Sequence, residues 1–83
     1  MLYEALVEVG LKPGHSDPEG ETTANSLKEL SYNVVKVKVG KTYTILLEAN
    51  SKQIAAEVID EICRRLLANP TKDIYTFKVA EAR

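Results

Sequence analysis

The chain has 83 residues, 45% hydrophobic and 28% charged, a composition that excludes a disordered or fibrous protein. Its 11 basic and 12 acidic residues nearly cancel, which excludes a global field strong enough to draw it onto nucleic acid or an anionic membrane. Charges interrupt every apolar run, and the amino terminus lacks a basic start, so we expect neither a membrane span nor a signal peptide. The only cysteine, Cys63, cannot close an internal disulfide. We therefore expect one domain, residues 1–83, in the cytoplasm.

The first predicted element is a strand over residues 2–11. Its odd positions are apolar and its glutamates stand at even positions, which is the period of two that a strand requires. A helix is predicted next, because Asp17 can cap amide groups and Pro18 suits the first helical position. Apolar residues at helical spacing continue this helix until residues 31–33 end it.

A second strand is predicted over residues 34–39, where valines at odd positions alternate with lysines at even ones. Gly40 and Lys41 are interpreted as a tight turn. After it, residues 42–49 resume the alternation, with apolar side chains again at odd positions. The pattern therefore predicts an antiparallel hairpin.

The second predicted helix follows Asn50 and Ser51, either of which can cap it, with Gln53 placed as in a capping box on Asn50. It carries a broad apolar stripe and ends before Asn69-Pro70. Two acid–base pairs with favourable spacing support it: Asp60–Arg64 and Glu61–Arg65. A last strand is predicted over residues 74–79, again from alternation.

The order strand, helix, strand, strand, helix, strand predicts an α+β fold of the ferredoxin-like, split βαβ type. Right-handed crossovers would give a four-stranded antiparallel sheet with both helices on one face. If the odd residues of the strands face the helices, the opposite face of the sheet carries charged residues and a few aliphatic ones. We interpret these aliphatic residues as candidates for a homodimer contact, with a tetramer left open and a solvated face as the alternative: Leu2, Leu6, Leu46 and Ile74.

The sequence offers no catalytic, metal or cofactor site. His15 is the only histidine, so a cluster of histidine ligands cannot be assembled within one chain. Cys63 lies on the apolar side of the second helix, where a buried hydrophobe is the expected role. The aromatic residues of the strands share the helix-facing register, which argues against nucleic-acid binding.

Several segments together resemble the small PurS subunit of phosphoribosylformylglycinamidine synthase, the amidotransferase of purine biosynthesis. They read Val-Gly-Leu-Lys-Pro-Gly at 9–14, Asp-Pro-Glu-Gly at 17–20, Val-Gly-Lys at 39–41 and Cys-Arg-Arg-Leu-Leu-Ala-Asn-Pro at 63–70. The resemblance spans nearly the whole chain. It departs from the usual pattern at residues 15–16 and 71–72, which affects local contacts rather than membership.

The resemblance implies a non-catalytic subunit that dimerises and joins a glutaminase subunit and a large synthetase subunit. It would help them assemble and pass ammonia, while ATP, Mg and glutamine are used by those partners. Residues of the two matching loops are our candidates for contact with the large subunit: Lys12, His15, Asp17, Gly20, Gly40 and Lys41.

One alternative of another class stays open at this point. Paired ferredoxin-like domains of this size often bind small molecules at the dimer interface, so a ligand-sensing regulatory module is the second hypothesis. A stand-alone enzyme is a third class, and it would require the pure protein to turn over glutamine or ATP.

Overall fold

The computed structural model describes residues 1–82. Three strands form one antiparallel sheet in the order β2-β1-β3. The elements follow the chain as β1 (Leu2–Leu11), α1 (Pro18–Glu29), β2 (Lys41–Glu48), α2 (Lys52–Ile62), the π-helical turn η1 (Cys63–Leu67) and β3 (Asp73–Glu81).

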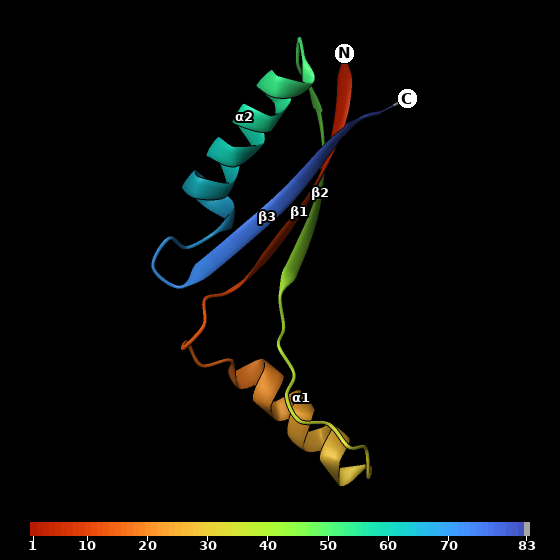
Figure 1. Cartoon of the computed structure of the whole chain (residues 1–83), viewed down its shortest axis with the longest axis vertical. Helices are drawn as coiled ribbons and strands as arrows, with labels where there is room; N and C mark the ends of the chain where they lie inside the picture. The colour runs from red at the N-terminus through yellow and green to blue at the C-terminus, as the bar shows by residue number, and fades with distance from the viewer. Residues whose placement is uncertain (83) are drawn as a thin grey trace.

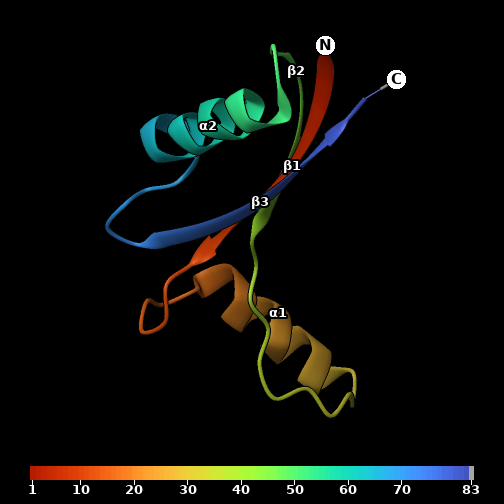
Figure 2. The same cartoon turned by 45° about the horizontal axis from the view of Figure 1, so that its top comes forward.

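The molecule has two regions, which Figures 1 and 2 show from two sides. The body consists of the sheet with α2 and η1 packed on it. The arm, residues 12–40, contains α1 and projects beyond one end of the sheet. The chain measures 51 × 29 × 14 Å, and its radius of gyration of 16.4 Å exceeds the about 12 Å of a compact chain of this length. The structure is therefore open rather than globular.

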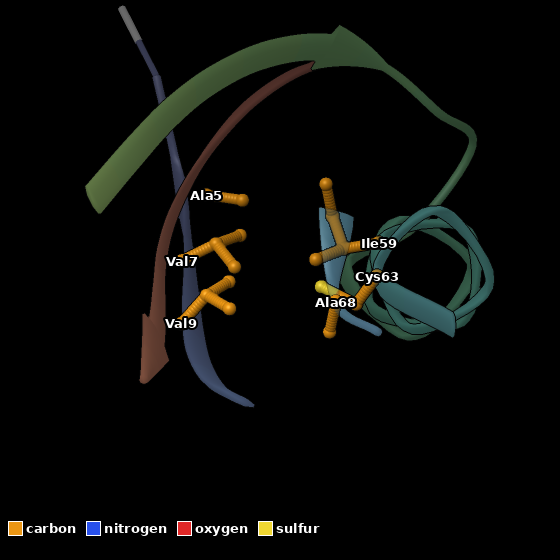
Figure 3. Packing of buried hydrophobic residues seen from close by; sticks show 6 residues of the cluster. All are labelled: Ala5, Val7, Val9, Ile59, Cys63 and Ala68. Carbon is orange, nitrogen blue, oxygen red and sulfur yellow. The ribbon is translucent and has the colours of Figure 1, made fainter. Parts of the chain in front are cut away.

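The hydrophobic core lies between α2 and the sheet. Ala5, Val7 and Val9 of β1 are buried, and they face Ile59 and Cys63 of α2 and η1 (Figure 3). The register places Ala5 opposite Ile45 on one side and Val79 on the other, so odd positions of all three strands share this face. The predicted helix-facing register is confirmed.

The second helix begins at Lys52, and its cap is Ser51, whose hydroxyl oxygen accepts a hydrogen bond from the Ile54 amide at 3.1 Å. The helix cap is therefore Ser51 and not Asn50, on which the capping box was predicted. The helix also widens near its end, since the Ala68 amide bonds the Cys63 carbonyl, five residues back, at 2.9 Å. The sequence pattern did not reveal this π-helical turn.

The first helix is confirmed, with Asp17 as its cap and Pro18 at its start. It ends in a Schellman motif, in which the Tyr32 amide bonds the Leu27 carbonyl and the Ser31 amide bonds that of Lys28. Ser31 takes the left-handed position of this motif with a φ of 71°. A serine therefore occupies a position that usually holds glycine.

The predicted strand over residues 34–39 is wrong within residues 1–82, and the expected four-stranded sheet has three strands. No tight turn forms at Gly40, because the chain runs extended from the arm directly into β2 (Figure 1). The reason lies in the alternation. A two-residue turn would place Val39 opposite Thr42, so the valines would share the face of Thr42 and not the core-facing side of Tyr43.

The expectation of two helices on one sheet face is also wrong for this single chain. Within residues 1–82 only α2, with η1 after it, covers the sheet, and α2 packs chiefly on β3 and β1. The core-facing side chains of β2 are consequently only half-buried: Tyr43, Ile45 and Leu47. The place that a first helix would occupy in the predicted fold is left uncovered, because α1 lies in the arm.

Candidate functional site

A cleft of about 820 Å³ lies where the arm leaves the body. Its walls come from the ends of β1, β2 and β3, the loop after β1, α1 and residues 35–40. Five of the six predicted partner-contact residues line it: Lys12, His15, Asp17, Gly40 and Lys41. The two loops singled out in the sequence, which are distant along the chain, therefore meet in space, and Gly20 is buried beside Asp17.

Asp17 holds the two ends of the arm together. One carboxylate oxygen accepts from the Gly20 amide at 2.9 Å, and the other accepts from the Val39 amide at 2.8 Å. These two backbone donors, that of Val39 first, hold the pKa of Asp17 below its ordinary value. The predicted cap is confirmed, but the bond to Val39 was missed, because no local pattern links positions 22 residues apart.

Two glycines allow close backbone approach at the base of the arm. A side-chain carbon on Gly20 would collide with the Val37 carbonyl oxygen, so α1 and the extended segment pack together only because Gly20 has none. A side-chain carbon on Gly40 would lie 2.8 Å from the Val9 carbonyl oxygen. Gly40 therefore marks the point where the chain passes tightly beside β1 and does not form a turn.

The cleft is bordered by more basic than acidic side chains. Its acids are Glu8, Asp17 and Glu21, and Asp17 is already occupied by amide donors. Five lysines border it: Lys12, Lys28, Lys36, Lys38 and Lys41. Lys12 donates from Nζ to the Pro70 carbonyl at 2.7 Å, which ties the loop after β1 to the loop before β3. The remaining lysines suit an acidic surface of another chain.

The predicted dimer-face residues lie on the sheet face opposite α2. Leu46 is 60% exposed, and Leu6 and Ile74 are also exposed. Leu2 is half-buried. The even positions of the strands therefore do form an uncovered face with scattered aliphatic side chains, and their use as a dimer contact stays a prediction.

The polar groups of the body have structural roles. Tyr75 donates its hydroxyl to Asp60 at 2.6 Å, and Arg64 donates to the other carboxylate oxygen at 2.9 Å. These two donors, Tyr75 first, lower the pKa of Asp60. The predicted Glu61–Arg65 pair is formed at 3.2 Å on the surface. The network fastens α2 to β3.

Cys63 is fully buried, and that burial raises the pKa of its thiol, so it behaves as a core residue. Among residues 1–82 no group of three or more histidine, cysteine or carboxylate side chains is placed to hold a metal ion. Nor does any helix in that range have the length and apolar character to span a membrane.

A three-stranded sheet, one covering helix and a projecting helical arm define a distinct type of small α+β domain. The same arrangement occurs in the Thermus thermophilus PurS structure, which shares 32% identity and a TM-score of 0.89 with this chain over 100% of both chains. This chain belongs to the PurS family, since the family model described as phosphoribosylformylglycinamidine (FGAM) synthase matches residues 4–81.

Two further relatives agree with this assignment. The phosphoribosylformylglycinamidine synthase subunit PurS of Methanocaldococcus jannaschii is 38% identical over 79 residues, covering 94% of this chain and 95% of the relative. A chain of the structure of PurLQS from Thermotoga maritima is 30% identical with a TM-score of 0.88, and the match covers 96% of this chain and 99% of that one. The resemblance seen in the sequence is confirmed.

Proposed function

We propose that this chain is a non-catalytic structural subunit of phosphoribosylformylglycinamidine synthase in purine biosynthesis. One observation carries the proposal: the chain matches nearly the full length of a chain in the PurLQS structure from T. maritima. The match extends through the arm as well as the body, so the surfaces available for assembly are of the same kind.

In this role the chain helps a glutaminase subunit and a large synthetase subunit to assemble and to pass ammonia between them. ATP, Mg and glutamine bind to those partners. The chemistry of the described side chains supports this division: His15 lies exposed in a loop, and Cys63 is buried with a raised thiol pKa. Neither is placed as an activated nucleophile or an oriented base.

The working unit of this proposal is a homodimer in the cytoplasm, and a tetramer is the alternative that a mass measurement distinguishes. The open shape supports self-association, because a chain this small gains stability when further apolar surface is covered. Light scattering of the purified chain tests this state, and a mass of one chain at micromolar concentration would contradict it.

Reconstitution tests the function directly. Purified candidate glutaminase and synthetase subunits are mixed with and without this chain, and glutamine-dependent amide transfer to formylglycinamide ribonucleotide is measured. We expect transfer only when all three are present. Equal rates without the chain, or turnover by the chain alone, would reject the proposal.

The cleft is the proposed contact for the large subunit. Lys41→Glu reverses a charge at its border and should weaken capture of the large subunit, while far-UV circular dichroism stays unchanged. Lys52→Glu, an exposed lysine at the start of α2 and outside the cleft, is the matched control and should bind like the parent. Equal capture by both variants would reject the contact.

The ligand-sensing alternative is tested on the same cleft, because its volume lies within the range of small-molecule sites. A thermal-shift screen of the isolated chain against amino acids and nucleotides separates the two functions. We expect no ligand-specific rise in melting temperature, and such a rise would favour the sensor.

A further inference from the structure

The even face of the sheet, formed by the even-numbered residues of β1, β2 and β3, is open. The second helix and η1 pack on the odd side chains, on the other side of the strands (Figure 2). On the even face Leu46 is 60% exposed, Ile74 51% and Leu6 42%. Aliphatic side chains exposed across all three strands mark a surface that can contact another protein.

The even face is also acidic. Its charged residues are three glutamates and one lysine: Glu4, Glu8, Glu48 and Lys78. The register places Glu4 between Leu46 and Ala80, and Glu8 lies between two threonines, so neither glutamate has a basic residue directly opposite. Lys78 is diagonal to both glutamates, and its single charge can neutralise only one of them. The centre of the face therefore keeps excess negative charge.

A hollow of about 180 Å³ lies in the even face between β1 and β3. Five residues line it: Leu6, Glu8, Thr76, Phe77 and Lys78. Sites for small molecules usually have about 300–1,000 Å³, so this hollow is too small for a separate ligand of that kind. Its size suits one side chain that a partner protein inserts.

The even face and the cleft meet at the end of the sheet, because Glu8 and Thr76 line both the hollow and the cleft. The two surfaces nevertheless differ in charge, since five lysines border the cleft and glutamates dominate the even face. A partner surface that is acidic enough to suit the cleft would be repelled by the even face. The two surfaces therefore fit two different partners that adjoin beside Glu8.

A second copy of this chain fits the even face poorly. Stacking two even faces about a two-fold axis opposes three glutamates on one copy to three on the other, and like charges across an interface are unfavourable. Docking the basic cleft of a second copy onto the even face gives a head-to-tail contact, which forms rings or filaments rather than a defined pair. The charge of the face favours a different protein.

We propose that the even face binds the glutaminase subunit, through a basic surface that inserts one apolar side chain into the hollow. This inference rests on the proposed function, in which the chain joins two partners, and it assigns the second partner to a surface distinct from the cleft. The large subunit at the cleft and the glutaminase at the even face then lie next to each other at the end of the sheet.

Two variants test the even face. Glu4→Lys reverses an exposed charge at its centre, and Leu46→Thr replaces an exposed apolar side chain with one that also favours strands. The matched controls are Glu57→Lys, at an exposed position of α2, and Leu66→Thr, at a leucine of η1 that is 80% exposed. Far-UV circular dichroism confirms that each variant is folded.

Each tagged variant is mixed with the purified candidate glutaminase and synthetase subunits, and the amount of each subunit captured is measured. We expect Glu4→Lys and Leu46→Thr to weaken glutaminase capture about tenfold and to retain the large subunit. Lys41→Glu should lose the large subunit, and both controls should capture like the parent. Raising the salt from about 0.05 M to about 0.5 M should weaken glutaminase capture by the parent more than by Glu4→Lys.

Unchanged glutaminase capture by both even-face variants would overturn the inference and leave the proposed function standing. Loss of the large subunit in place of the glutaminase would also overturn it, as would salt-independent capture by the parent. A fall in the mass of the isolated chain on light scattering, seen in both even-face variants, would show a second copy on this face instead. Capture of neither subunit by the parent would overturn the proposed function itself.

Discussion

The body and the arm are held together by different forces. The body buries Ala5, Val7, Ile59 and Cys63 completely and so gains the hydrophobic stabilisation that drives folding. The arm buries only Gly20 and Ala24 along α1, and its order comes from hydrogen bonds at the two helix ends and from the Asp17 carboxylate. Polar geometry thus gives the arm its shape without a core, and its apolar surface remains available to another molecule.

The largest expected effect comes from a change in the hydrophobic core, which lies in the body. Ile59→Ala removes a fully buried side chain and should cost about 2–5 kcal/mol of unfolding free energy, measured by urea unfolding with far-UV circular dichroism. Leu66→Ala, on the exposed side of η1, is the control and should cost under about 0.5 kcal/mol. Equal costs would show that the burial of Ile59 does not stabilise the body.

Gly20→Ala tests the arm. The added carbon meets the Val37 carbonyl oxygen, so α1 must move from the extended segment, at a cost of about 1–3 kcal/mol. We expect the near-ultraviolet circular dichroism of the body to survive, because the added carbon displaces only α1.

Gly10→Ala is the matched control for that change, because open space surrounds Gly10 in β1. Alanine in a strand avoids the entropy cost of glycine, so this variant should gain about 0.5–1 kcal/mol. If both variants lose stability equally, close packing at Gly20 does not explain the result.

Each region contains one carboxylate with a lowered pKa, Asp17 in the arm and Asp60 in the body. A lowered pKa in the folded chain means that the stabilisation is present above the ordinary value of about 3.9 and is lost as the pH falls through the lowered value. Asp17→Asn should therefore flatten the loss of stability as the pH falls below about 4. An unchanged acid limb in urea unfolding would contradict the role of Asp17.

The smallest expected effect concerns the end of α1. Ser31 adopts a left-handed conformation that glycine accepts without strain, so Ser31→Gly should stabilise the chain by up to about 1 kcal/mol. The measurement is again urea unfolding, with dimer mass as a check. A loss of stability would show that the serine side chain contributes a contact that the Schellman geometry alone does not reveal.

The sequence predicted well what depends on short periods. Alternation gave the register of β1 and β3, and cap chemistry gave the starts of both helices, because these signals act within a few residues. It failed at residues 34–39, where the alternation is present but the segment pairs with no strand within residues 1–82. A strand pattern shows which side of a segment is apolar and does not show whether that segment joins a sheet.

The candidate site was predicted in part for a similar reason. The two loops were found as matching segments, and the structure brings them together around one cleft. The Asp17–Val39 bond and the Tyr75–Asp60 bond were missed, since each joins residues distant in sequence. Gly20 was predicted only as a candidate partner contact, whereas the structure shows it buried and packed closely on Val37.

The π-helical turn η1 after α2 determines where the chain can accept an insertion or a deletion of one residue. Buried positions follow one another at Ile59, Cys63 and Ala68, so the turn absorbs one additional residue while the flanking side chains keep facing inward. In β1 a gain or loss of one residue would reverse every side chain beyond it. Insertions and deletions among homologues should therefore accumulate between residues 63 and 68 and be rare in the central strand.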